Sequence, residues 1–172
     1  MTDVSPFPSD VLDSAAAVLD RARQAGLRLA AAESCTGGLI AAALTDIAGC
    51  SDVVEGGAVT YSNTLKQTVL GVPEPLLRES GAVSKPVARA MAQGAVARLK
   101  ADVAVAVTGI AGPGGGTADK PVGLVWIATA RKGRATVARE HRFGDIGRTR
   151  VRMETVRAAL RMLDAALDQA AP

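Results

Sequence analysis

A serine stands where a short apolar segment gives way to a helical pattern, in residues 32–38, which read Ala-Glu-Ser-Cys-Thr-Gly-Gly. The first N–H groups of a helix have no partner inside the helix, so they can stabilise the oxyanion of an acyl transfer. Glycines here would let a substrate approach the backbone closely. Ser34 is therefore a candidate nucleophile, although the position also fits an ordinary helix N-cap. The candidate oxyanion or substrate-binding positions are Cys35, Thr36, Gly37 and Gly38.

A serine nucleophile needs a base, and the chain offers one histidine and one well-placed lysine. His141 is the only histidine, and no motif places an acidic partner beside it. Lys66 ends the segment Tyr-Ser-Asn-Thr-Leu-Lys at residues 61–66. Burial or positive neighbours can lower the pKa of a lysine toward neutrality, so we expect Lys66 to be the base and Tyr61 to pass or orient a proton. The alternative is an exposed lysine on a short helix.

Cys35 is an alternative nucleophile, because it also lies near the helix N-terminus, which lowers the pKa of a thiol. Cys35 and Cys50 are the two cysteines of the chain and could form one disulfide at most, which a domain of this size does not need. A reduced, cytoplasmic setting is the simpler expectation. One histidine and two cysteines do not make up a zinc site, so we expect no metal and no cofactor.

A glycine-rich segment follows the apolar run at residues 103–107. Residues 108–117 read Thr-Gly-Ile-Ala-Gly-Pro-Gly-Gly-Gly-Thr, and successive N–H groups in such a loop can bind an anion. The segment matches neither a Walker A loop nor the dinucleotide-binding fingerprint. We expect it to contact substrate, with a flexible surface loop as the alternative. The candidate positions are Thr108, Gly109, Gly112, Gly114, Gly115, Gly116 and Thr117.

Alternating helical and strand-like patterns must position these residues. We expect helices at residues 9–26, 36–48, 65–70 and 86–100. We expect strands at residues 27–33, 52–61, 103–107, 122–130 and 135–143. Ser9 and Ser84 are the predicted N-caps of two of the helices, and Lys132-Gly133 is the predicted hairpin turn between the last two strands. This order predicts an α/β fold with a mixed sheet covered by helices.

The chain ends in a long helix with an apolar stripe, formed by Met153, Val156, Leu160, Leu163 and Leu167. Such a stripe favours core packing over a dimer seam. With 172 residues, 48% of them hydrophobic, the chain can build a core of its own. We expect a flexible tail at residues 1–8 and a single domain over residues 9–172.

Two classes of protein are disfavoured by the distribution of charge. Glycines and a proline interrupt the longest uncharged run, at residues 103–118, so we expect no membrane span and no membrane partner. The first residues also carry no signal-peptide pattern. Ten of the twenty Lys and Arg residues lie at 131–161, but acidic residues are interleaved and aromatic residues for base stacking are scarce. Nucleic-acid binding is therefore not the favoured interpretation.

Four ordered motifs resemble the CinA C-terminal domain family, the nicotinamide mononucleotide amidohydrolases. They are Ala-Glu-Ser-Cys-Thr-Gly-Gly at 32–38, Tyr-Ser-Asn-x-x-Lys at 61–66, the glycine-rich segment at 108–117 and Lys-Pro-Val-Gly at 120–123. The resemblance spans residues 10–165. The chain resembles the single-domain form rather than the longer members with an additional N-terminal domain.

This resemblance implies a fold and a reaction. The implied fold is a three-layer α/β/α sandwich with a mixed, mostly parallel sheet of about five strands, expected as a homodimer. The implied reaction converts nicotinamide mononucleotide and water to nicotinate mononucleotide and ammonia, in the recycling of pyridine nucleotides. Ser34 would be the nucleophile, Lys66 the base and Tyr61 its proton-handling neighbour, while Asn63, Thr108 and the glycine loop would hold substrate. The alternatives are a nucleotide-binding module without catalysis and a nucleic-acid-associated protein.

Overall fold

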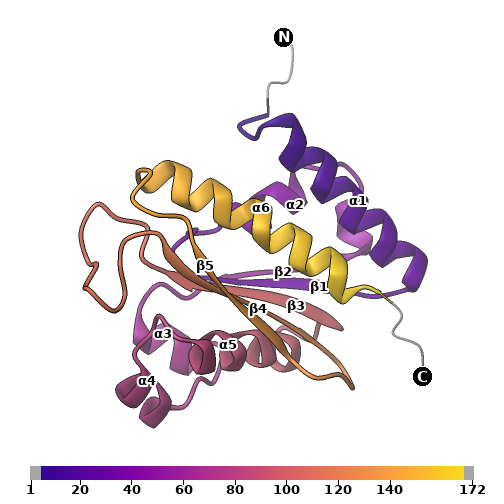
Figure 1. The fold of residues 1–172 in the computed structure, drawn as a ribbon. Helices are drawn as coiled ribbons and strands as arrows, with labels where there is room; N and C mark the ends of the chain where they lie inside the picture. Colours follow the sequence, from indigo (N-terminus) through magenta and orange to yellow (C-terminus); the bar gives the residue numbers. More distant parts are fainter. Residues whose placement is uncertain (1–4, 169–172) are drawn as a thin grey trace.

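The structure is a computed structural model that describes residues 5–168, and its centre is a five-stranded sheet (Figure 1). The elements follow in the order α1 (Ser9–Ala25), β1 (Leu29–Glu33), α2 (Leu39–Thr45), the 3₁₀ turn η1 (Cys50–Asp52), β2 (Val54–Val59), α3 (Asn63–Thr68), α4 (Glu74–Ser80), α5 (Lys85–Arg98), β3 (Val103–Gly109), β4 (Leu124–Arg131), β5 (Val137–Arg142) and α6 (Arg148–Ala166). Within the described residues, no helix combines the length and the apolar character that crossing a membrane requires.

The sheet is mixed, with the strand order β2-β1-β3-β4-β5. β1 pairs in parallel with β2 on one side and with β3 on the other. β4 is antiparallel to both of its neighbours, so it alone runs against the other strands. The expected α/β fold with a mixed, mostly parallel sheet is confirmed, as is the predicted hairpin between the last two strands.

Helices cover both faces of this sheet (Figure 1). α1, α2 and α6 lie on one face, and α3, α4 and α5 lie on the other. The alternation of side chains along the central strand β3 explains the two layers. Its valines at 103, 105 and 107 face α1 and α6, whereas its alanines at 104 and 106 face α5. Small residues under α5 let that helix pack close to the sheet.

The apolar stripe of α6 packs inside the chain. Val156, Leu160, Leu163 and Leu167 are buried in the cluster that α6 shares with α1 and the sheet, and Met153 packs against that cluster. The stripe is therefore core, as the sequence favoured, and not a dimer seam.

Three sequence predictions about helix termini are wrong in detail. Pro8 rather than Ser9 stands at the N-cap of α1, without a side-chain cap. The helix predicted at residues 36–48 begins only at Leu39, because Gly37 and Gly38 have positive φ angles that form a turn. Ser84 does occupy the N-cap position of α5, but its hydroxyl donates to the Gly81 carbonyl instead of capping the helix.

The predicted flexible tail at residues 1–8 also needs correction. Phe7 is buried, with 8% of its surface exposed, and belongs to the core between α1 and the sheet. Phe7 precedes the N-cap of α1 and Leu12 lies in the next turn, the spacing of a hydrophobic staple. Residues 1–4 and 169–172 lie outside the described part of the chain.

Candidate active site

The candidate catalytic residues meet where three neighbouring parallel strands end. Ser34 directly follows β1, Thr60 directly follows β2, and Thr108 is the penultimate residue of β3. The carboxyl ends of parallel strands lie at one edge of a sheet, so these residues are adjacent in space. The strand ends are fixed to each other, because the Ser34 N–H donates to the Val107 carbonyl and the Thr60 N–H donates to the Glu33 carbonyl.

Ser34 and Lys66 form a buried pair. Their Oγ and Nζ atoms lie 3.1 Å apart, and the side chain of Lys66 is 1% exposed. Lys66 Nζ also lies 2.8 Å from the Thr60 carbonyl and 3.3 Å from the Tyr61 carbonyl. The prediction that these two residues come together is confirmed, and the alternative of a surface lysine is wrong.

Burial shifts the pKa of Lys66, the candidate base, and of Cys35, the alternative nucleophile. Desolvation lowers the pKa of Lys66, while the Cys35 thiol opposes this shift. Desolvation raises the pKa of Cys35 to about 12. A thiol with such a pKa holds its proton at neutral pH, so this environment disfavours Cys35 as the nucleophile.

The turn after Ser34 is held by the carboxyl group of Glu33, which is fully buried. It accepts hydrogen bonds from the Thr36 hydroxyl and from the backbone N–H groups of Gly38, Ile40 and Ala41. Glu33 therefore accepts hydrogen bonds from backbone N–H groups that we expected to be free to bind an anion. Because Gly38 stands at the N-cap of α2, the interpretation of Ser34 as a helix cap is wrong.

The donors that remain for an oxyanion are those next to Ser34. The Gly37 N–H donates to the Ser34 carbonyl. Among the described residues, the N–H groups of Cys35 and Thr36 make no hydrogen bond. They are the donors of this turn that have no partner in the described part of the chain; Cys35 is 5% exposed and Thr36 is fully buried.

Arg148, in the first turn of α6, joins Tyr61 to the glycine loop. Its guanidinium donates to the Gly112 carbonyl at 2.9 Å and to the Tyr61 hydroxyl at 3.3 Å. The phenol of Tyr61 is largely exposed and points to this arginine, while only its backbone carbonyl contacts Lys66. One turn later, Arg152 donates to the Thr36 carbonyl at 2.8 Å. Arg152 therefore connects α6 to the nucleophile turn, and Arg148 connects it to Tyr61 and the glycine loop.

The glycine loop has a fixed base and an exposed tip. The hydroxyl of Thr108 is buried and donates to the Ala82 carbonyl. A Cβ at Gly109 would lie 2.6 Å from the Val125 side chain, so close packing with β4 requires glycine there. The Thr117 hydroxyl accepts from the Lys120 N–H and closes the loop. Gly114, Gly115 and Gly116 form the exposed part of the loop, and Asn63 is an exposed residue at the start of α3.

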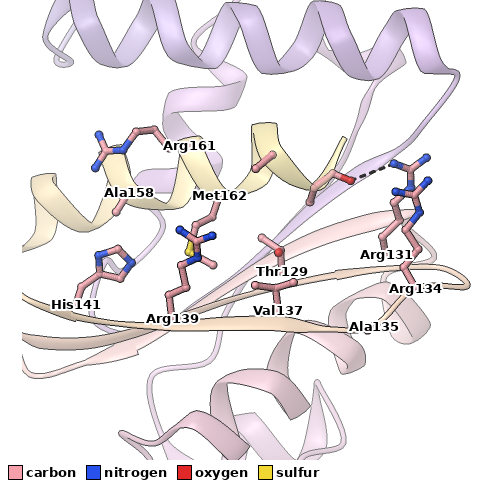
Figure 2. A pocket seen from close by; sticks show the side chains of 12 residues that line it. Thr129, Arg131, Arg134, Ala135, Val137, Arg139, His141, Ala158, Arg161 and Met162 are labelled. Carbon is pink, nitrogen blue, oxygen red and sulfur yellow. Dashed lines mark hydrogen bonds between the residues drawn. The ribbon is translucent and has the colours of Figure 1, made fainter. Parts of the chain in front are cut away.

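His141 takes no part in this site. It lies on β5, where Figure 2 shows its ring between the strand and α6. Sequence reasoning missed Thr60, the role of Glu33, and Arg148 and Arg152. The two arginines are spaced i, i+4 at the start of a helix, a signal that marks one face, but nothing in the sequence tells where that face packs.

A model of the CinA C-terminal domain matches residues 12–167. The chain belongs to the CinA C-terminal domain family. It is 53% identical over 154 residues to a CinA-like protein of Syntrophus aciditrophicus, covering 90% of this chain and 36% of that protein. It is 56% identical over 131 residues to a CinA-like protein of Akkermansia muciniphila, covering 73% of this chain and 32% of that protein.

Solved structures of CinA-type proteins share this fold. The competence/damage inducible protein CihA of Agrobacterium tumefaciens superposes with a TM-score of 0.93 at 53% identity, covering 96% of this chain and 100% of that one. The competence damage-inducible protein A of Klebsiella pneumoniae superposes with a TM-score of 0.88 at 36% identity, covering 94% and 99%. The chain spans about a third of the length of the curated CinA-like relatives that it matches.

Proposed function

We propose that this protein hydrolyses the carboxamide of nicotinamide mononucleotide, giving nicotinate mononucleotide and ammonia. The proposal combines the four motifs of the family with one structural observation. That observation is the buried contact between Ser34 Oγ and Lys66 Nζ, at 3.1 Å, beside two backbone carbonyls.

This contact supports Lys66 as a base. A neutral amine has two N–H groups and one lone pair. The carbonyls of Thr60 and Tyr61 are placed to accept both N–H groups, which leaves the lone pair to accept the Ser34 hydroxyl proton. The lowered pKa of Lys66 favours this neutral form. Ser34 Oγ can then attack the carboxamide carbon as its proton passes to Nζ.

The remaining steps use groups at the same turn. The N–H groups of Cys35 and Thr36 stabilise the oxyanion of the tetrahedral intermediate. The protonated Lys66 returns its proton to the carboxamide nitrogen, which leaves as ammonia, and Ser34 remains as an ester of nicotinate mononucleotide. A water molecule then attacks that ester with Lys66 again as base, and nicotinate mononucleotide is released.

Arg148 is our candidate for the substrate phosphate. It belongs to the first turn of α6, whose N-cap is Gly147 without a side-chain cap, and a helix N-terminus favours an anion. Its guanidinium already bridges Tyr61 and the glycine loop, so a phosphate bound there would lie near Ser34 and Lys66. Arg152 would support the site through its bond to the Thr36 carbonyl.

Ammonia release from nicotinamide mononucleotide tests the reaction and the nucleophile together. Ser34→Ala should lower kcat by at least about 10³-fold, whereas Cys35→Ala should keep most of the activity. Loss of activity only in the cysteine variant would move the nucleophile to Cys35. Tight binding of the mononucleotide without ammonia release would replace the proposal by a non-catalytic binding module.

The phosphate assignment has its own test. Arg148→Gln should raise KM for nicotinamide mononucleotide about tenfold or more, because it removes a charge-assisted hydrogen bond. KM for nicotinamide riboside, which lacks the phosphate, should change little. The matched control is Arg150→Gln, an exposed arginine on the same helix. Equal effects on the two substrates would contradict a phosphate-binding role.

A further inference from the structure

A cavity lies between the β4–β5 hairpin and α6, away from the candidate active site (Figure 2). Its volume is about 460 Å³, within the range of small-molecule sites, and none of the proposed catalytic residues lines it. β5 contributes alternate residues to it, Val137, Arg139 and His141, because successive side chains of a strand point to opposite faces.

The charge of this cavity is entirely positive. Its charged side chains are the arginines at 131, 134, 139 and 161, and the ring of His141 lies beside them. The one acidic residue of β5, Glu140, lies on the opposite face and pairs with Arg142. Among residues 5–168, no Asp or Glu side chain lines the cavity to neutralise the arginines.

Two of these four arginines donate hydrogen bonds to backbone carbonyls, and the other two make no polar contact within the described residues. Arg131 donates to the Ala166 and Asp168 carbonyls, and Arg134 donates to the Asp168 carbonyl. Across residues 5–168, the guanidinium groups of Arg139 and Arg161 make no hydrogen bond or ion pair.

His141 supplies a second and independent sign of a ligand. Its Nε2 atom is buried and has no hydrogen-bond partner among the described residues. A buried polar atom without a partner is unusual in a folded protein, and a bound group would satisfy it. Burial, followed by the charges of Arg161 and Arg139, lowers the pKa of His141.

The floor of the cavity is apolar. Val137 is 48% exposed there, and α6 adds Ala158, Met162 and Ala165. A ligand that fits both the arginine-lined wall and the apolar floor carries several negative charges and an apolar or aromatic group. Arginine guanidinium planes can also stack on an aromatic group. Two copies of the chain that met through this same face would bring two sets of arginines together, so like charges oppose that arrangement.

We propose that this cavity binds a nucleoside polyphosphate, with the phosphates on Arg139, Arg161 and His141 and the nucleoside on the apolar floor. This inference does not depend on the proposed amidohydrolase reaction. The site is separate from Ser34 and Lys66.

Calorimetric titration of the full chain with ATP, inorganic tripolyphosphate and adenosine tests the assignment. At about 0.15 M salt, long-range attraction to surface charge is largely screened. ATP should bind more tightly than tripolyphosphate, and adenosine more weakly than both. The double variant Arg139→Gln, Arg161→Gln should weaken ATP binding about tenfold or more. The matched control is Arg142→Gln, Arg150→Gln, which removes equal charge from the same strand and helix outside the cavity.

A nuclear magnetic resonance titration adds a local readout. His141 is the only histidine of the sequence, so its ring-proton signal in the untagged protein is unambiguous. ATP should raise the pKa of His141, because a nearby anion favours the protonated ring. The control double variant should show the same rise.

Several outcomes would overturn the proposal. They are no ATP binding at millimolar concentration, equal weakening in the control double variant, and equal affinity for ATP and tripolyphosphate. Loss of ATP binding in Arg148→Gln would place the nucleotide at the catalytic site instead. A change of oligomeric state in the Arg139, Arg161 double variant, seen by sedimentation, would assign the cavity to contact between copies of the chain.

Discussion

At the scale of single residues, the informative group is the amine of Lys66. Its folded-state pKa lies below the ordinary value of 10.5, so the unfolded chain binds its proton more tightly. Stability linked to this group therefore rises with pH between the folded pKa and 10.5, and below the folded pKa the penalty for burying the charge is complete.

Lys66→Met should abolish hydrolysis and change how stability depends on pH. The variant loses the bonds to two carbonyls at every pH, but it also escapes the penalty of burying a charge. The free energy of unfolding of the variant minus that of the native protein should therefore be more positive at pH 7 than at pH 10, so the variant is relatively more stable at pH 7. Urea unfolding followed by circular dichroism measures this difference.

Lys85→Met is the control for that experiment, since Lys85 is an exposed lysine whose loss changes net charge equally. Its stability relative to the native protein should shift much less between the two pH values. If the free energy of unfolding of Lys66→Met differed from that of the native protein by the same amount at both pH values, folding would not lower the pKa of Lys66. Hydrolysis by the native protein should rise with pH, with a midpoint below pH 10.5.

Single-residue chemistry was predictable where the motif itself fixes the geometry. Ser34 directly follows β1 and Lys66 lies in α3, the helix after the neighbouring parallel strand β2, so topology brings them together. Glu33 was not predictable as a structural residue, because its burial depends on the turn made by Gly37 and Gly38 at φ angles of 62° and 100°. An acidic residue in that segment also fits an exposed strand end.

At the scale of elements, Glu33 fixes how β1 passes into α2. Glu33→Gln replaces one acceptor oxygen by an amide that faces backbone donors, so buried N–H groups lose their partner. The free energy of unfolding should fall by about 3 kcal/mol, which lowers Tm by roughly 6–12 °C for a chain of this size. Scanning calorimetry gives the value.

Activity measurements separate the two consequences of that change. Because the turn carries Ser34 and the two free donors, kcat should fall while KM changes less. Glu79→Gln, at an exposed position of α4, should leave Tm and kcat near the native values. If Glu33→Gln were as stable as this control, the buried carboxyl group would not be what holds the turn.

Elements with strong internal patterns were predicted well, and their ends were not. The valine and alanine alternation of β3 and the hairpin turn at Gly133 are local signals, and the pairing of β4 with β5 follows from the turn. The site arginines could not be chosen from sequence. Half of the chain's basic residues lie at 131–161, and only the docking of α6 against β3 and β4 selects Arg148 and Arg152.

At the scale of the whole molecule, Phe7, which lies just before α1, belongs to the core. Phe7→Ala should lower the free energy of unfolding by about 3 kcal/mol, because it leaves a cavity between α1 and its neighbours. Thermal unfolding should shift by roughly 6–12 °C.

Ile146→Ala is the matched truncation of an exposed apolar residue, with 41% of its surface accessible. It should cost less than about 1 kcal/mol. Equal effects of the two substitutions would mean that residues 5–8 do not pack as described.

The contact between Arg148 and Tyr61 joins residues that are 87 positions apart. During synthesis, a chain that has emerged only through β3 already carries Ser34 and Lys66, but it has no arginine for the phosphate. The proposed enzyme would therefore bind its phosphorylated substrate weakly until α6 has emerged and docked. In refolding experiments, helical signal should return first and hydrolysis last, because contacts of long sequence separation form slowly. The moment at which the proposed enzyme gains its full substrate affinity thus depends on when α6 is made.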